Sequence, residues 1–177
     1  VKEAIINLKK ELKVPLLGFC GAPFTLATYL IEGGSSQDFI ATKKWMYHHQ
    51  DALHTLLELL TDQSIEYLKM QIKAGVDAIQ IFDSWASIIP HPLLESYSMQ
   101  YLRKITDAIR PYKTPIILFA RGSSLFINEL IDIQPHAISI DTFGNLKALA
   151  SHVPDHIALQ GNFDPDLLFA PLPTLKQ

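Results

Sequence analysis

The sequence has little that would suit a secreted or membrane protein. Cys20 is the single cysteine, so no internal disulfide can form, and we expect a reducing compartment, the cytoplasm. No apolar run approaches the roughly 20 residues that cross a bilayer, and no signal-peptide pattern opens the chain. We therefore expect no membrane contact. The chain also lacks a Met at position 1, where Val1 leads directly into a helical pattern, and this predicts a piece of a longer protein.

Positive charge is scarce as well. The 15 Lys and Arg residues are outnumbered by 18 Asp and Glu, which gives a formal net charge of −3. A nucleic-acid surface normally needs a clustered basic excess, so we expect no nucleic-acid partner. Three of the basic residues are arginines, Arg103, Arg110 and Arg121. Hydrophobic residues make up 48% of the 177 positions, which suits one domain with a substantial core.

Apolar periodicity predicts helices that alternate with five short strands. The predicted strands cover 16–19, 78–82, 115–120, 137–140 and 157–160. The predicted helices cover 2–12, 24–31, 38–74 as two helices, 93–109, 125–133 and 146–152. Such alternation requires a parallel sheet, and continuous apolar strands indicate helices on its faces. Two α/β architectures fit, an open doubly wound sheet and part of a (β/α)8 TIM barrel, which usually needs about 250 residues.

Local signals mark where several helices begin and end. Pro23 suits the first turn of a helix. Gly33 and Gly75 follow apolar stretches and predict helix ends, and Asp38 predicts the cap of the next helix.

Polar residues gather where the predicted strands end. The segments at these ends are 18–26, 83–85, 121–124, 141–142 and 161–165. Because the carboxyl ends of parallel strands carry the functional site in both architectures, this asymmetry predicts a small-molecule site. Asp83 and Asp141 suit helix caps as well as functional carboxylates, and Asp164-Pro165 is typical of a turn.

The stretch GFCGAPFTL (18–26) allows three interpretations: a reactive thiol, a phosphate loop or a pocket rim. No histidine ends a predicted strand to pair with Cys20, so a buried, inert thiol is the better interpretation. The spacing and lysine of a P-loop are absent. His48, His49 and His54 lack metal-ligand spacing, so we expect surface or core roles for them.

Strand parity places the side chains that follow the second predicted strand. Successive side chains alternate between faces, so Gln80, Phe82 and Ser84 point together while Asp83 points the other way. Tyr29, in the first short helix, adds a phenol near the same end.

Four segments of the sequence resemble the uroporphyrinogen decarboxylase family in order and spacing. They are PLLGFCGAPFTLATYLIEGGSS (15–36), QIFDSWAS (80–87), ILFARG (117–122) and LQGNFDP (159–165). The resemblance extends from Val1 to about Phe169. It implies a TIM barrel of which residues 1–177, a single partial domain, supply about strands three to seven. The amino- and carboxyl-terminal parts of the barrel, with an arginine-rich loop, an essential aspartate and a site histidine, would then be absent.

The resemblance implies a carboxy-lyase of haem and tetrapyrrole biosynthesis. Members of this family remove carbon dioxide from the four acetate side chains of uroporphyrinogen III and give coproporphyrinogen III. They need no metal and no organic cofactor, because the protonated pyrrole ring accepts the electrons of the breaking bond. The resemblance also implies a cytoplasmic homodimer.

The resemblance also assigns site residues. Tyr29 matches the family's catalytic and substrate-binding tyrosine, and Ser84 matches a carboxylate-binding position. Phe19 and Phe82 match cleft-lining positions, and Arg121 matches a basic residue at a strand end. A polyanionic substrate requires more positive charge than one strand-end arginine supplies, so we expect the 177-residue piece alone to be inactive.

Two other functions fit the sequence less well. A methyltransferase of the same barrel superfamily would carry a zinc-binding His-x-Cys pair at a strand end, where this chain has Phe119-Ala120-Arg121-Gly122. A non-catalytic module is the other alternative, which the intact Tyr29 and Ser84 disfavour.

Overall fold

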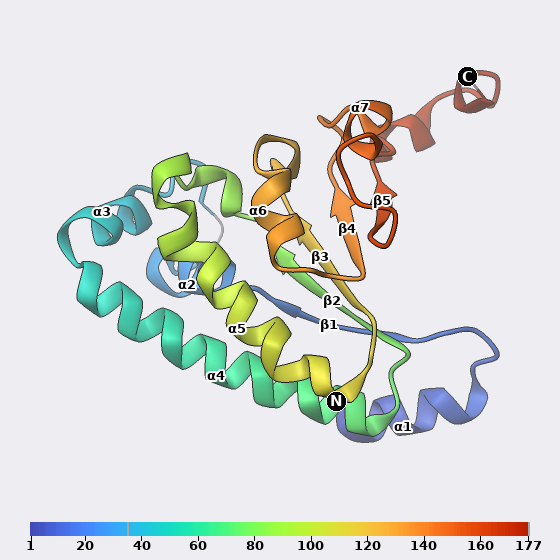
Figure 1. Ribbon diagram of the computed structural model, residues 1–177, viewed down its shortest axis with the longest axis horizontal. Coiled ribbons are helices and arrows are strands. Elements are labelled where there is room, and N and C mark those ends of the chain that lie inside the picture. Colours follow the sequence, from blue (N-terminus) through green and yellow to red (C-terminus); the bar gives the residue numbers. More distant parts are fainter. Residues whose placement is uncertain (35, 177) are drawn as a thin grey trace.

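Five parallel strands joined by helices make up the computed structural model, which describes residues 1–34 and 36–176 (Figure 1). The helices and strands are, in chain order, α1 (Lys2–Glu11), β1 (Leu17–Gly21), α2 (Pro23–Glu32), α3 (Ile40–His48), α4 (Gln50–Ala74), β2 (Ala78–Asp83), α5 (Gln100–Ile109), β3 (Ile116–Ala120), α6 (Ile127–Asp132), β4 (Ala137–Ile140), α7 (Leu146–Ala150) and β5 (Ala158–Gly161). All five predicted strands are therefore present, with bounds within about two residues of the prediction.

The strand order distinguishes between the two architectures. Each strand pairs in parallel with the next one along the chain, in the order β1-β2-β3-β4-β5. A doubly wound sheet reverses its order at a switch point, whereas a (β/α)8 barrel never does. The sheet is therefore an arc of a β/α barrel, and the predicted fold class is confirmed.

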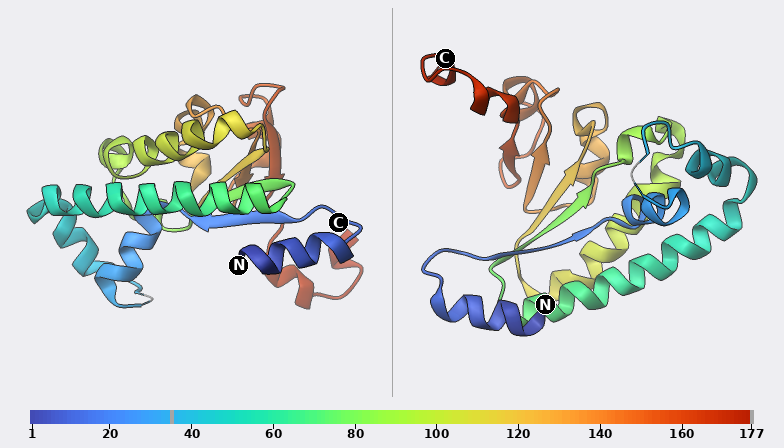
Figure 2. Two further views of the ribbon diagram at one scale, coloured as in Figure 1. Left: turned by 90° about the horizontal axis from the view of Figure 1, so that it is seen from below. Right: turned by 180° about the vertical axis from the view of Figure 1, so that it is seen from behind.

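Helices cover one face of the sheet and leave the other open. Helices α4, α5 and α6 lie in front of the strands in Figure 1. In the right-hand view of Figure 2, which shows the molecule from behind, the strands lie in front of α4 and α5. Side chains that face the helices, such as Cys20, Ile81 and Leu118, are buried. Phe19 and Phe82, on the opposite face, keep solvent exposure. The predicted parity of Phe82 and Asp83 is confirmed, because Asp83 is fully buried on the helix side.

Several of the predicted helix boundaries are confirmed and one is wrong. Pro23 is the first residue of α2, and Gly33 and Gly75 end α2 and α4 with φ of 73° and 104°, a left-handed conformation that favours glycine. Asp38 does not cap α3. Instead, the Glu32 carboxylate accepts the Thr42 N–H at 2.8 Å, because the end of α2 lies beside the start of α3.

The predicted helix over 93–109 is interrupted near its start. A π-helical turn, Glu95–Met99, precedes α5 and directs Ser98 toward the end of β2. Wide turns of this kind often occur at functional sites. In the described part of the chain, no helix combines the length and the apolar character needed to cross a bilayer.

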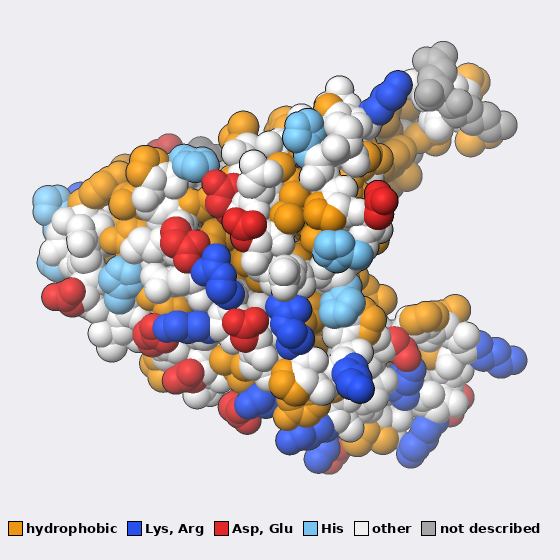
Figure 3. Space-filling view, viewed as in Figure 1, with side chains coloured by type: hydrophobic (Ala, Val, Ile, Leu, Met, Phe, Trp, Pro, Cys, Tyr) orange, Lys and Arg blue, Asp and Glu red, His pale blue; other side chains and the backbone are white. Residues whose placement is uncertain are grey.

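The helix-covered surface carries charges of both signs, interspersed over α4 and α5 (Figure 3). At the amino-terminal end of the sheet, Lys9 of α1 donates to the Asp77 carboxylate at 2.6 Å, and Asp77 also accepts the Leu16 N–H at 2.7 Å. This contact attaches α1 to the residue that precedes β2.

Candidate functional site

A row of aromatic rings lies on the open face of the sheet. The Phe19 and Phe82 centroids are 6.1 Å apart in an edge-to-face arrangement, and those of Phe82 and Phe119 are 5.7 Å apart. Phe19 is 60% exposed. The two predicted cleft-lining residues therefore lie together, with Phe119 as a third member, and form an apolar floor that spans β1, β2 and β3.

The corner after β1 connects this floor to α2. The Ala22 N–H donates to the Phe82 carbonyl at 2.9 Å, which extends the pairing of β1 with β2 by one residue. A Cβ on Gly21 would lie 2.8 Å from the Leu26 side chain, so glycine lets Leu26 pack closely against the turn into α2. Of the three interpretations of GFCGAPFTL, the geometry fits the pocket rim.

Trp85 contacts two of the predicted site residues, Tyr29 and Arg121, and we call these three side chains the rim of the site. The Tyr29 and Trp85 ring centroids are 6.4 Å apart, and the Arg121 guanidinium carbon lies 4.9 Å from the Trp85 ring centroid. Phe39 also contacts Trp85, with centroids 4.7 Å apart. Tyr29 is 41% exposed. No role was predicted for Trp85 from the sequence, although its position directly after Ser84 at a strand end was a usable signal.

Ser84 stands between the floor and the rim in the chain. It follows the last residue of β2 and is partly exposed. Within residues 1–34 and 36–176, no hydrogen bond engages its hydroxyl group, so the group can donate to a ligand.

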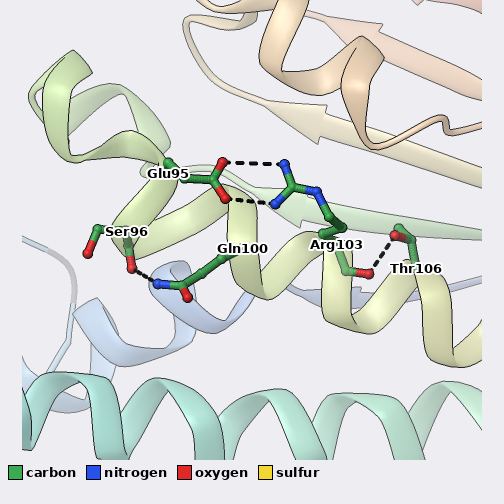
Figure 4. A network of polar contacts seen from close by, with 5 residues as sticks. All are labelled: Glu95, Ser96, Gln100, Arg103 and Thr106. Carbon is green, nitrogen blue, oxygen red and sulfur yellow. Dashed lines mark hydrogen bonds and ion pairs between the residues drawn. The ribbon is translucent and has the colours of Figure 1, made fainter.

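Arg121 differs from the other two arginines in its partners. Arg103 forms a two-pronged ion pair with Glu95, with distances of 2.7 and 3.3 Å (Figure 4). Arg110 donates to the Asp107 carboxylate and to the Ile133 carbonyl. For Arg121, the described residues provide no carboxylate within ion-pair distance. Its guanidinium group therefore remains available to bind an anion.

A pocket of about 590 Å³ opens beside Arg121 at the carboxyl ends of β3, β4 and β5. Its walls are Phe119, Arg121, Ile140, Asp141, Thr142, Phe143, Gly161, Asn162, Phe163, Asp164 and Pro165. Hydrogen bonds from side chains to backbone groups connect these loops. The Asp141 carboxylate accepts the Gly122 N–H at 2.6 Å, and the Asn162 amide donates to the Gly144 carbonyl at 2.6 Å. Asp141 thus braces loops rather than capping a helix.

The other strand-end acids also have structural partners. The Asp164 carboxylate accepts the Asp166 N–H at 3.0 Å, as expected of a turn. Asp83 is not a helix cap. Its carboxyl group is fully buried and accepts hydrogen bonds from the hydroxyls of Thr25 at 2.7 Å and Ser98 at 2.5 Å. Burial raises the pKa of Asp83, and the two hydroxyl donors oppose that shift.

Cys20 and the histidines have the roles that the sequence predicts. Cys20 is buried, and burial raises the pKa of its thiol to about 12, so no thiolate forms near neutral pH. His54 stacks on Tyr97 and hydrogen-bonds the Tyr101 hydroxyl at 2.7 Å. Residues 1–34 and 36–176 contain no group of three or more His, Cys, Asp or Glu side chains placed to hold a metal ion.

Comparison with known proteins places this barrel arc in a family. A family-level sequence comparison matches residues 1–177 to Uroporphyrinogen decarboxylase (URO-D). The chain therefore belongs to the uroporphyrinogen decarboxylase family. It is 50% identical over 177 residues to a uroporphyrinogen decarboxylase of Protochlamydia amoebophila and 38% identical over 183 residues to one of Vibrio cholerae.

The chain spans about half the length of these relatives. The alignments cover all of this chain, 48% of the Protochlamydia protein and 52% of the Vibrio protein. Among solved structures, a methyltransferase from Methanosarcina mazei matches 90% of this chain and 47% of its own, with a TM-score of 0.76 and 22% identity. This likeness supports the barrel fold alone.

Proposed function

We propose that this chain is the central part of a uroporphyrinogen decarboxylase, which removes carbon dioxide from the acetate side chains of uroporphyrinogen and releases coproporphyrinogen. The single observation that carries the proposal is the match of all 177 residues to that family. The arrangement of Tyr29 and Arg121 on either side of Trp85 supports it.

Each predicted site residue then receives a role. Phe19 and Phe82 form the floor against which the pyrrole rings pack. Arg121 binds a substrate carboxylate, and the Ser84 hydroxyl donates to a second one. Tyr29 hydrogen-bonds the substrate beside the reacting acetate.

The reaction needs no electron acceptor besides the substrate. Protonation of a pyrrole ring makes it a cation, the bond to the carboxylate carbon breaks, and its electron pair enters the ring as carbon dioxide leaves. A proton then adds to the remaining carbon to give a methyl group, and the ring releases the proton that it first took up, which restores the neutral pyrrole. Fixed dipoles around the ring stabilise the positive charge, and we propose that the protein uses neither a metal nor an organic cofactor.

The proposal extends to the rest of the protein. Residues 1–177 form one partial domain, about strands three to seven of the barrel, and further arginines come from outside this chain. A homodimeric state and a cytoplasmic location, without nucleic-acid or membrane partners, complete the proposal on the basis of the family resemblance.

A chimera tests the proposal. This chain replaces the matched half of the Protochlamydia amoebophila relative, with which it shares 50% identity. We expect the chimera to convert uroporphyrinogen into coproporphyrinogen with and without a chelator, as measured by chromatography of the oxidised porphyrins. Tyr29→Phe and Ser84→Ala should each reduce turnover or substrate binding. A folded chimera without decarboxylation, or one that a chelator inactivates, contradicts the proposal.

A further inference from the structure

Asp83 occupies an unusual position for a carboxyl group. It is the last residue of β2, it is fully buried, and no Lys, Arg or His among the described residues pairs with it. Its two oxygens instead accept hydrogen bonds from Thr25 and Ser98. Burying a carboxyl group without a cation costs free energy, so packing alone would favour an apolar residue at position 83.

The Thr25 hydroxyl links Asp83 to the rim by a second hydrogen bond. While it donates to Asp83, its oxygen accepts the backbone N–H of Trp85 at 3.2 Å. The chain of hydrogen bonds therefore runs from the π-helical turn through the end of β2 and the first turn of α2 to the backbone that follows Ser84.

Trp85 depends on this anchor. Its indole N–H is buried and has no hydrogen-bond partner among the described residues, so no hydrogen bond of the ring fixes its orientation. The ring nevertheless contacts both Tyr29 and Arg121. Its backbone N–H bond to Thr25 ties its position to Asp83, while its backbone carbonyl accepts the Ile88 N–H at 3.1 Å within the turn that follows.

Tyr29 is coupled to the same anchor. It lies four residues after Thr25 in α2, one helical turn along the same face. A helix is stiff over one turn, so the contact that locates Thr25 also locates Tyr29.

We propose that Asp83 is a positioning residue, which holds Thr25 and thereby sets the relative placement of Tyr29, Trp85 and Arg121 at the rim. The proposal rests on the proposed function for its kinetic consequences, but its structural consequence stands independently. Burial raises the pKa of Asp83, and the hydrogen bonds from Ser98 and Thr25 oppose that shift because they stabilise the ionised form, in which both oxygens accept.

The structural test uses the 177-residue chain itself with Trp45→Phe, which leaves Trp85 as its only tryptophan. We expect Asp83→Ala and Thr25→Val to shift the emission maximum of Trp85 and to increase its quenching by acrylamide. Asp83→Asn keeps an acceptor for Thr25 and should preserve the parent emission. Ser98→Ala is the matched control: it removes the hydrogen bond to Asp83 that does not lead to Trp85, and it should preserve the parent emission as well.

The kinetic test uses the same four variants in the chimera. Asp83→Ala and Thr25→Val should raise KM about tenfold, because both remove the hydrogen bond between Asp83 and Thr25 and so displace the side chains at the rim. KM does not depend on how much enzyme is folded, so destabilisation alone does not change it. Asp83→Asn and Ser98→Ala should keep KM within about twofold of the parent.

The outcomes separate the two proposals. Thr25→Val preserves side-chain volume, so it keeps the test open if Asp83→Ala fails to fold. Unchanged Trp85 emission in Thr25→Val overturns the positioning role. The same holds if Ser98→Ala perturbs Trp85 as strongly as Thr25→Val does. If the chimera is inactive while the Trp85 emission of the 177-residue chain follows the expected pattern, the proposed function is contradicted and the positioning role is supported.

Discussion

At the scale of single residues, Arg121 connects the electrostatics of the chain to its proposed substrate. The other two arginines are engaged in ion pairs, and Arg121 lies over Trp85 at the edge of a pocket. A guanidinium group that rests on an aromatic ring keeps its donor edge free for a carboxylate.

We expect Arg121→Met in the chimera to raise KM for uroporphyrinogen about tenfold or more, because a hydrogen bond to a charged group is lost. Steady-state kinetics with the reduced substrate measures the change. Arg103→Met is the matched control: its ion pair with Glu95 is exposed, so KM should remain within about twofold. Equal effects of the two substitutions would exclude a specific role for Arg121.

Asp77 provides a pH-dependent contact at the opposite end of the sheet. Its hydrogen bond from Lys9, followed by that from the Leu16 N–H, lowers the pKa of Asp77 below its ordinary value of 3.8. A lowered carboxyl pKa contributes stability above the ordinary value, and that stability is lost as pH falls through the folded-state pKa.

Asp77→Asn should therefore lower the urea midpoint of the chimera at about pH 7, and the difference should disappear toward about pH 3. Urea unfolding at both pH values measures it. Asp62→Asn, on the exposed face of α4 and without an ion pair among the described residues, should have no such pH-dependent effect. A difference for Asp77→Asn that persists at acid pH would show that the charge does not matter.

At the scale of elements, α4 supports the outer strand β1 through one side chain. The Gln71 amide accepts the Phe19 N–H at 3.0 Å and donates to the Phe19 carbonyl at 2.9 Å. In an outer strand of a parallel sheet, every second residue points its backbone N–H and C=O away from the neighbouring strand. Gln71 therefore takes the place of a missing strand at Phe19. Gly18 leaves the space for it, since a Cβ there would lie 2.6 Å from the Gln71 side-chain oxygen.

Replacing Gln71 should loosen β1 at the aromatic floor. We expect Gln71→Met to reduce the free energy of unfolding of the chimera by about 1 kcal/mol, because two partly buried backbone groups of Phe19 lose their partner. Amide hydrogen exchange at Phe19 should accelerate. Gln63→Met, an exposed position of the same helix, is the control and should change neither quantity. Unchanged exchange at Phe19 in Gln71→Met would refute this account of the strand edge.

The elements also show how far the sequence could predict the molecule. Strands such as 137–140 were predictable because continuous apolar runs are typical of buried parallel strands. The partners of Asp83 were not, since Thr25 lies 58 residues and Ser98 15 residues away in the chain. An acid after a strand is usually a helix cap, and its burial depends on contacts that local patterns do not contain. Trp85 was missed for the same reason, because Tyr29 and Arg121 reach it from two other elements.

At the scale of the whole molecule, the described arc exposes the face that a closed barrel would bury. Leu17 and Phe19 are 46% and 60% exposed, and β1 and β5 are outer strands of the sheet. Exposed apolar surface beside an unpaired strand favours association. In Figure 3, hydrophobic side chains also line the hollow between the α1 end and the carboxyl-terminal end of the chain.

We therefore expect the 177-residue chain to self-associate at micromolar concentration and to lack decarboxylase activity, whereas the chimera should give a defined species, a dimer by the family resemblance. Size-exclusion chromatography with light scattering, together with the porphyrin assay, measures both. An active, strictly monomeric 177-residue chain would contradict the partial-barrel account.

The most direct test of the central claim, that this face of the sheet is the substrate cleft, is a crystal structure of the chimera with coproporphyrinogen bound. We expect pyrrole rings against Phe19 and Phe82, with a propionate carboxylate on the Arg121 guanidinium. Product bound with no contact to these three side chains would contradict it.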